Sequence, residues 1–277
     1  TPVYYIFFHS IENSGRQVQE NALLYEDGHY AMDFADLEEK LADPLTTLLI
    51  LCNPHNPAGK LWTKEELARL GELCQRYHVQ VISDEIHCDL TDPGTEYVPF
   101  AAAAEVCAAI SVTCISASKA FNIAGLQSAA VMIPAEALRQ KMVRGLNADE
   151  LAEPNSFAIE ATVAAFRGGA AWLDALRSYL YENKQLVRRF LQQELPAIRV
   201  ASGAATYLLW LDCRKFSADV PGLCAFLRRE TGLFLTAGVQ YRGNGRDFLR
   251  MNIACPRSRI EDALQRLKQG CTAYLQK

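Results

Sequence analysis

The chain has 277 residues, of which 50% are hydrophobic and 22% are charged, a balance typical of a globular protein with a substantial core. The formal net charge is −4 and no stretch is rich in Lys and Arg, which argues against a nucleic-acid partner, because binding phosphates requires clustered cations. No apolar run reaches membrane-spanning length, so we expect neither a membrane anchor nor a secretory signal.

Nine cysteines are scattered along the chain without any C-x-x-C pair. An odd number without paired spacing predicts free thiols rather than a disulfide framework or a zinc site. We therefore expect a reducing compartment, the cytoplasm. The sequence begins at Thr1 rather than Met and reads as the middle of a domain, so we also expect the chain to be a fragment.

The first residues are rich in aromatic side chains. Residues 1–11 predict a helix or a strand–helix junction, and the rings of Tyr4 and Tyr5 could stack on a flat cofactor or pack in the core. Residues 21–32 predict a strand and a turn, and residues 33–41 a short helix.

A buried strand is predicted over residues 46–52, because this apolar run has the length of a strand. It ends in the rigid loop 53–59, where two Asn-Pro pairs force extended backbone and leave their amides free to face a cleft. Ligands bind at this end of the strands in α/β sheets, which favours a binding loop over a plain turn. Thr63 and Glu66 then predict a capping box for a helix that reaches about Tyr77.

The next predicted strand, residues 79–83, is followed by a run of polar side chains, Asp84-Glu85-Ile86-His87-Cys88-Asp89. Such a run could bind a metal, but neighbouring side chains at a strand end point in alternating directions and no second ligand cluster follows, so we expect no metal. The alternative is an acid, Asp84, paired with a cationic ring nitrogen, with His87 reaching the same ligand. Pyridoxal phosphate (PLP) sites require such a carboxylate.

A third strand is predicted over residues 111–116, and it leads into Ser116-Ala117-Ser118-Lys119. A lysine among small and apolar residues is costly to bury unless it is paired or neutralised. Desolvation lowers the pKa of such an amine and makes it nucleophilic, as Schiff-base chemistry requires. An ordinary surface lysine after a strand remains the alternative at this point.

The alternation of strands and helices predicts a mostly parallel sheet, with further elements at 128–133 (strand), 134–144 (helix), 145–156 (polar loop) and 158–166 (helix). Gly168-Gly169 breaks this pattern, and a long amphipathic helix follows at 170–194. The remainder predicts a smaller α+β module, with strands at 205–211, 233–236 and 248–253 and helices at 222–230 and from 258. We therefore expect two domains, residues 1–168 and 169–277.

Arg250 lies inside the last predicted strand, between Leu249 and Met251. A buried arginine is costly without an anionic partner, and its planar fork matches a carboxylate. The partner could be a ligand or an acid of the protein itself.

Together, four motifs resemble the fold-type I PLP enzymes of the class I/II aminotransferase group: Asn56-Pro57-Ala58-Gly59, Asp84-x-x-His87, Ser116-x-Ser118-Lys119 and Arg250-x-Asn252. The resemblance covers nearly the whole chain. Residues 118–127, and Arg250-Met251-Asn252 with residues 255–258, resemble the cystathionine β-lyase branch, the PatB/MalY-type C–S lyases. The resemblance implies an α/β/α large domain that binds PLP, residues 1–168, and a smaller α+β C-terminal domain.

The resemblance also implies roles around the cofactor. Lys119 would bind the PLP aldehyde covalently and then move protons at the substrate Cα. Asp84 would pair with the pyridine nitrogen, and Asn56 would hydrogen-bond the ring O3′. Tyr4 would stack on the ring.

The phosphate and the substrate have implied partners as well. Ser116 and Ser118 would help to hold the phosphate, Tyr5 would line the substrate side, and Arg250 would bind the substrate α-carboxylate. His87 would also contact the cofactor, although it stands where aminotransferases usually carry a tyrosine near O3′.

The resemblance implies a PLP-dependent C–S lyase that cleaves cystathionine or L-cysteine S-conjugates by α,β-elimination to a thiol, pyruvate and ammonia. Gln127 favours this reaction, because many aminotransferases carry a phosphate-binding arginine at that position. The alternatives are a PLP-dependent aminotransferase of amino acids and a non-catalytic PLP-fold regulator or scaffold. The resemblance further implies a homodimer and an N-terminal segment that this chain lacks.

Overall fold

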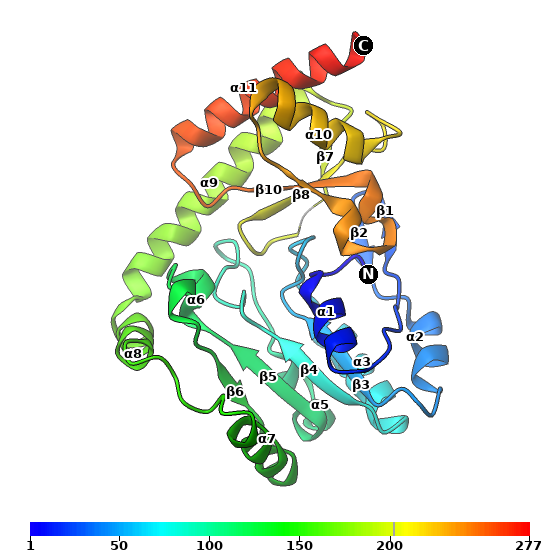
Figure 1. Cartoon of the computed structure of the whole chain (residues 1–277), viewed down its shortest axis with the longest axis vertical. Helices are drawn as coiled ribbons and strands as arrows, with labels where there is room; N and C mark the ends of the chain where they lie inside the picture. The colour runs from blue at the N-terminus through cyan, green and yellow to red at the C-terminus, as the bar shows by residue number, and fades with distance from the viewer. Residues whose placement is uncertain (202) are drawn as a thin grey trace. The chain divides into compact units, whose positions relative to one another are not determined.

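The computed structural model describes residues 1–201 and 203–277, which divide into two compact units (Figure 1). Unit 1 contains residues 1–33, 55–60 and 178–277, and unit 2 contains residues 34–54 and 61–177. This division differs from the predicted boundary at residue 168, because the first 33 residues pack with the C-terminal part of the chain. The assignment of residues 1–168 to cofactor binding stays a prediction.

Unit 2 is built on a four-stranded sheet in the order β3-β4-β5-β6. Its strands are β3 (Leu48–Cys52), β4 (Gln80–Asp84), β5 (Ser111–Ile115) and β6 (Ala130–Met132). The first three strands are parallel to one another, and β6 runs antiparallel to β5. The predicted α/β fold with a mostly parallel sheet is therefore confirmed.

The helices of unit 2 are α2 (Phe34–Leu41), α3 (Lys64–Arg76), α4 (Phe100–Ala103), α5 (Glu105–Ile110), α6 (Ala117–Ala120), the 3-10 helix η1 (Ala124–Leu126), α7 (Glu136–Ala148) and α8 (Ala158–Gly168). The capping box of α3 is confirmed: Thr63 Oγ1 accepts from Glu66 N at 3.1 Å, and Glu66 Oε2 accepts from Thr63 N at 2.8 Å. The predicted loop from residue 145 is wrong in its first part, since α7 continues to Ala148.

Unit 1 contains a four-stranded antiparallel sheet in the order β7-β8-β10-β9 and a separate hairpin, β1-β2. The strands are β1 (Leu24–Glu26), β2 (His29–Ala31), β7 (Arg199–Val200), β8 (Leu208–Asp212), β9 (Thr236–Ala237) and β10 (Phe248–Asn252). The helices are α1 (Ile6–Asn13), α10 (Val220–Thr231), α11 (Arg257–Leu275), and the 3-10 helices η2 (Gly238–Tyr241) and η3 (Gly243–Asp247). Helix α9 (Ala170–Glu194) begins in unit 2 and ends in unit 1, with the bounds that the sequence predicts.

Two predicted strands of unit 1 are shorter than expected. The strand predicted from residue 205 begins only at Leu208, because Thr206 adopts a positive φ of 64°, which an extended strand does not accommodate. In place of the strand predicted at 233–236, β9 consists of Thr236 and Ala237, which pair with Arg250 and Leu249 of β10.

The two faces of the unit 1 sheet pack against different sets of side chains. Leu211 of β8 and Leu249 of β10 face the main core, which they share with buried side chains of α9, α10 and α11. Side chains alternate between faces along a strand. The opposite face therefore carries Trp210, Phe248 and Arg250, and there Trp210 and Phe248 join a second, aromatic cluster with hairpin residues. No helix among the described residues has the length and apolar character needed to cross a membrane.

Candidate active site

The predicted site residues fall into two groups, one in each unit. Asp84, His87, Ser116, Ser118 and Lys119 belong to unit 2. Tyr4, Tyr5, Asn56 and Arg250 belong to unit 1.

Asp84 is the last residue of the central strand β4 and is half-buried. Its in-register neighbours are Cys52 on β3 and Cys114 on β5, so the carboxyl group lies between two thiol side chains. Asp84 Oδ1 accepts a hydrogen bond from Ile86 N at 3.2 Å. Burial raises the pKa of Asp84, and the positive charge of Lys119 offsets part of that rise. A cation placed against this carboxyl would stabilise its ionised form.

Lys119 lies on the short helix α6, directly after β5, and is half-buried. Ser116 is the N-cap of this helix: its Oγ accepts from Ser118 N at 3.0 Å and donates to Ser128 O at 2.7 Å. The hydroxyl of Ser116 therefore shapes the turn that carries the lysine. The phosphate-binding roles of Ser116 and Ser118 stay predictions.

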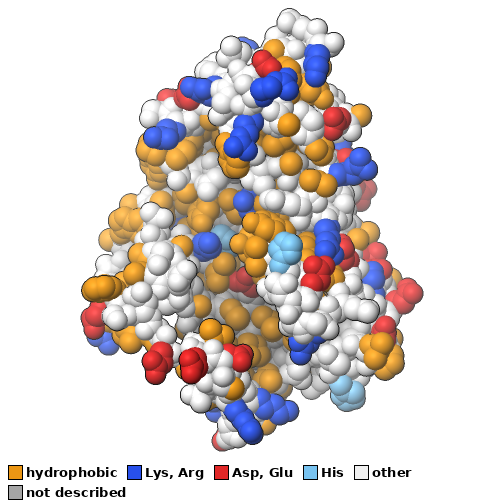
Figure 2. All heavy atoms as spheres, in the orientation of Figure 1, with side chains coloured by type: hydrophobic (Ala, Val, Ile, Leu, Met, Phe, Trp, Pro, Cys, Tyr) orange, Lys and Arg blue, Asp and Glu red, His pale blue; other side chains and the backbone are white. Residues whose placement is uncertain are grey.

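A cavity of about 230 Å³ opens beside Ser116. The side chains of Ile159, Val163 and Phe166, on α8, give it an apolar wall. All three side chains are exposed, in a part of unit 2 where Figure 2 shows many apolar (orange) atoms at the surface.

In the polar run at the end of β4, Glu85 bonds to groups of the protein itself. Glu85 is 2% exposed and its carboxylate accepts hydrogen bonds from Ser83 Oγ at 2.8 Å, from Phe100 N at 2.9 Å and from the Tyr97 hydroxyl. Among the described residues, no three His, Cys, Asp or Glu side chains are grouped as metal ligands. Glu85 thus fixes the protein segment behind β4, while the role of the buried His87 stays a prediction.

Arg250 and Asn56 meet in unit 1. The Nη1 of half-buried Arg250 donates to Oδ1 of buried Asn56 at 3.3 Å, and its guanidinium lies 5.1 Å from the centroid of the Tyr241 ring. No carboxylate of the described residues forms an ion pair with Arg250. The half-buried guanidinium is therefore available to an anionic ligand.

Tyr4 and Tyr5 precede α1 in the same unit, with their ring centroids 5.3 Å apart. Tyr5 also makes an edge contact with Tyr241, at 6.1 Å between centroids. Burial raises the pKa of Tyr207, and the charge of Arg250 partly offsets that rise, so Tyr207 lies within electrostatic reach of the arginine. Sequence reasoning missed Tyr207 and Tyr241, because nothing local distinguishes either residue from a core aromatic.

The donor sets of both units fit PLP. Unit 2 supplies an acid that lacks a strong hydrogen-bond partner, as a pyridinium nitrogen requires, and a lysine that can hold the aldehyde. Unit 1 supplies the buried Asn56 amide and the Arg250 guanidinium, which pairs with no acid of the described residues. The unit 2 groups could hold the ring nitrogen and the aldehyde, and the unit 1 groups could hold the ring O3′ and a substrate carboxylate.

Comparison with known proteins agrees with this chemistry. Residues 1–267 match the family model described as aminotransferase class I and II. The chain is 43% identical over 267 residues to cystathionine β-lyase PatB of Bacillus subtilis (strain 168), covering 96% of this chain and 69% of that protein. It is 36% identical to protein MalY of Escherichia coli (strain K12), covering 94% of this chain and 66% of that protein.

A solved structure extends the likeness to three dimensions. Cystalysin from Treponema denticola, which contains a pyridoxal 5′-phosphate cofactor, matches with a TM-score of 0.95 at 31% identity, covering 99% of this chain and 70% of that chain. The family match spans both units and includes every residue of the candidate site. The chain therefore belongs to the aminotransferase class I and II family of PLP-dependent enzymes.

Proposed function

We propose that this protein is a PLP-dependent carbon–sulfur β-lyase. It cleaves cystathionine or L-cysteine S-conjugates by α,β-elimination to a thiol, pyruvate and ammonia. The observation that carries the proposal is the guanidinium of Arg250, which Asn56 holds at 3.3 Å and which no described acid neutralises. The 43% identity to a cystathionine β-lyase supports the lyase reaction within the family.

PLP, when bound, supplies an electron sink that stabilises negative charge at the substrate Cα. Arg250 binds the substrate α-carboxylate and so orients the Cα–H bond for proton loss. Lys119 would hold the cofactor aldehyde, and its amine would take the proton from the substrate Cα. The Cβ–S bond then breaks with its electron pair going to sulfur, which takes up a proton to give the thiol, and water hydrolyses the remaining 2-aminoacrylate to pyruvate and ammonia.

Asp84 would pair with the ring nitrogen of bound PLP and so favour its protonated form. Burial raises the pKa of this carboxyl, and a cationic ring nitrogen beside it would lower that pKa again, so that the acid and the ring stabilise each other's charge. Asn56 hydrogen-bonds O3′ and also holds Arg250, which links the cofactor contact to the substrate contact.

Five further residues complete the proposed site. Tyr4 stacks on the ring and Tyr5 lines the substrate side. Ser116 and Ser118 help to hold the phosphate, and His87 contacts the cofactor. Both tyrosines are half-buried, so part of each side chain stays open to a ligand, although Tyr5 also packs against the aromatic cluster of unit 1.

Amino transfer is the second candidate, because the matched family includes aminotransferases. Gln127 favours the lyase: it follows η1 in the left-handed region, with φ 51°, and places an uncharged amide where an arginine would add charge for the phosphate. A non-catalytic role is disfavoured by the presence of Lys119, Asp84 and Arg250 together.

Product analysis separates these functions. The PLP-loaded full-length protein should release pyruvate and thiol from L-cystathionine in equal amounts without any added keto acid. Formation of pyruvate would be followed with lactate dehydrogenase, and the thiol with a disulfide reagent. Amino transfer from L-cystathionine to an added keto acid, without thiol release, would contradict the lyase proposal. No reaction of L-cystathionine, with or without a keto acid, would favour a non-catalytic protein.

A homodimer in the cytoplasm is the proposed assembly and location. The exposed apolar residues of α8, such as Ile159 and Phe166, support a contact surface, and all nine cysteines are free thiols, which supports a reducing compartment. Light scattering coupled to size-exclusion chromatography should give twice the mass of one full-length chain; the mass of a single chain would contradict the dimer.

A further inference from the structure

The guanidinium of Arg250 lies over the ring of Tyr241, a residue with no role in the proposed reaction. Tyr241 is fully buried, and its ring centroid lies 5.1 Å from the arginine Cζ. A cation over the face of an aromatic ring is attracted by the ring quadrupole. Tyr241 therefore contacts the charge that binds the substrate in the proposed function.

The Tyr241 ring packs against the indole of Trp210. The two rings meet edge to face, with centroids 5.3 Å apart and planes at 79°. Trp210 in turn stacks on Phe248, with ring centroids 5.0 Å apart and an angle of 3° between the ring planes. The rings of Tyr241, Trp210 and Phe248 are all fully buried and form a closely packed platform beside the arginine.

Close backbone packing leaves the platform no room to shift. A Cβ on Gly238, the first residue of η2, would lie 2.6 Å from Cη2 of Trp210 and 2.2 Å from Gly245 O. Only glycine lets η2 approach the indole this closely, and η2 ends at Tyr241. The position of the Tyr241 ring is thereby set by the backbone on one side and by the indole on the other.

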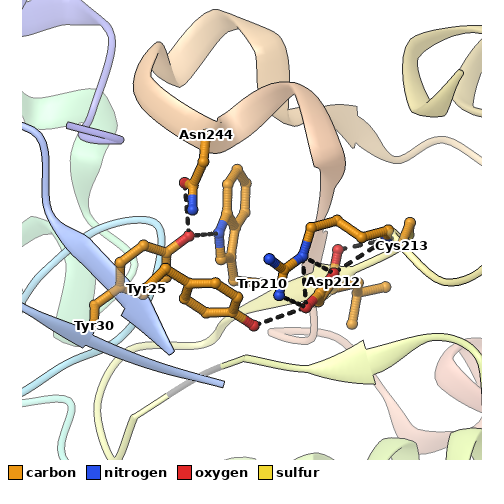
Figure 3. Close-up of polar contacts among 8 residues, drawn as sticks. Tyr25, Tyr30, Trp210, Asp212, Cys213 and Asn244 are labelled. Atoms are coloured by element: carbon orange, nitrogen blue, oxygen red, sulfur yellow. Dashed lines mark hydrogen bonds and ion pairs between the residues drawn. The ribbon is translucent and has the colours of Figure 1, made fainter. Parts of the chain in front are cut away.

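Hydrogen bonds fix the indole from the hairpin side, as Figure 3 shows. Trp210 Nε1 donates to the hydroxyl of Tyr30 at 3.0 Å, and that hydroxyl donates to Oδ1 of Asn244 at 2.9 Å. Asn244 belongs to η3, which follows η2 in the chain. Trp210 also lies directly opposite Arg250 in the pairing of β8 with β10, on the same face of the sheet.

From these contacts we propose that Tyr241 is a positioning residue for substrate recognition: its ring and the Asn56 amide hold the Arg250 fork in the orientation that receives the α-carboxylate. The inference rests on the proposed function, in which Arg250 binds that group. The ring acts through Arg250 and does not contact the reacting atoms. An arginine oriented before binding loses less conformational freedom when the carboxylate arrives.

The test compares a substrate with its own ester. S-methyl-L-cysteine carries the carboxylate and its methyl ester does not, so the acid-to-ester ratio of kcat/KM reports on the carboxylate contact alone. In the PLP-loaded full-length protein, Tyr241→Met should lower this ratio about tenfold, mainly through KM for the acid, because Met fills much of the space without a π face. Tyr241→Phe, which keeps the ring, should restore the ratio.

A matched control removes a comparable contact elsewhere in unit 1. Arg228 lies 4.9 Å from the centroid of the exposed Phe234 ring, so Phe234→Met should leave the ratio unchanged. Because both substrates are measured in one sample, partial loss of folded protein cancels. If the Met variant does not fold, Tyr241→Leu tests the same loss.

Two outcomes would overturn the inference in distinguishable ways. If Arg250→Lys lowers the ratio but Tyr241→Met and Tyr241→Leu do not, Arg250 binds the carboxylate without help from the ring, and the positioning role is wrong. If Arg250→Lys leaves the ratio unchanged as well, the carboxylate role of Arg250 in the proposed function is wrong too.

Discussion

Arg250 in unit 1 and Asp84 in unit 2 carry opposite charges of the proposed reaction, and their surroundings are organised differently. The Cζ of Arg250 lies 5.1 Å from the centroid of the buried Tyr241 ring, and its Nη1 donates a hydrogen bond to Asn56 Oδ1 at 3.3 Å. Asp84 lies between Cys52 and Cys114 and accepts a backbone hydrogen bond from Ile86 at 3.2 Å. Protein side chains orient the guanidinium, whereas the carboxyl lies beside two weakly polar thiols.

This difference indicates a division of labour. We expect the substrate contact proposed for Arg250 to be oriented before the substrate binds, because the Tyr241 ring and the Asn56 amide already contact the guanidinium within unit 1. The cofactor contact in unit 2 has an acid whose pKa burial raises, so a cationic ring nitrogen is the partner that would restore its ionisation. We expect substitutions in unit 2 to damage the chemistry and substitutions under Arg250 to damage substrate binding or stability.

The largest expected effect is that of Lys119→Ala. Removing the amine removes both the covalent hold on the cofactor and the base for the Cα proton, so kcat should fall by at least about 10³-fold. The visible absorption of bound cofactor should be lost at the same time. Lys141→Ala, on the outer helix α7, is the matched control; activity retained in the Lys119 variant would contradict the assignment.

The second effect is that of Asp84→Asn. An amide cannot stabilise a protonated ring nitrogen, so kcat should fall roughly 10²-fold, the size of losing one preorganised electrostatic partner. KM should change little, because Arg250 is untouched. Asp89→Asn removes a nearby carboxyl whose pKa burial also raises, and it should keep most of the activity. Equal losses in the two variants would show that Asp84 has no special role.

A smaller effect is expected from Tyr30→Phe, beneath the platform. The variant loses the acceptor for Trp210 Nε1 and the donor to Asn244, and the free energy of unfolding should fall by about 1–2 kcal/mol. Urea denaturation would measure it. Tyr274→Phe, whose hydroxyl makes only long contacts of 3.4 and 3.5 Å, should cost less than about 0.5 kcal/mol. A similar cost in both variants would argue against a fixed platform.

The smallest effect is a pH dependence of stability that arises from Asp212. Burial raises the pKa of Asp212, but hydrogen bonds from Arg214 and Tyr25 outweigh burial and hold that pKa below its usual value (Figure 3). A depressed native pKa stabilises the folded state above the unfolded-state value, and the contribution is lost as pH falls through the native value.

Asp212→Asn should therefore lower the melting temperature at pH 7, and its difference from the wild type should shrink below about pH 4. Asp262→Asn, in an exposed pair with Arg266, should show little difference at any pH. A difference for Asp212→Asn that persists unchanged at low pH would contradict the ionic origin of the effect.

Much of the fold could be predicted from local patterns. Helix α9 and the capping box of α3 have local causes, an amphipathic period and a Thr-x-x-Glu motif, so their positions could be predicted. The antiparallel direction of β6 and the short length of β9 depend on how each strand pairs with its neighbour in the sheet, which the residues of the strand alone do not record.

The candidate site shows the same limit. Lys119 and Arg250 stand out in the sequence because a charge among small or apolar residues needs an explanation, and Asp84 stands out because it directly follows a predicted buried strand. Tyr241 does not stand out in the sequence, because a tyrosine near glycines is as typical of a core position as of a binding site. Its importance depends on Arg250 and on the Tyr30–Trp210 hydrogen bond, which joins residues 180 positions apart.

Reductive trapping is the most direct test of the central claim that Lys119 holds the cofactor. The PLP-loaded full-length protein would be treated with borohydride, digested, and mapped by mass spectrometry. The account predicts a pyridoxyl group on the peptide that contains Lys119 and loss of that adduct in Lys119→Ala. A stoichiometric adduct on a different lysine, or a loaded protein that carries no adduct, would contradict it.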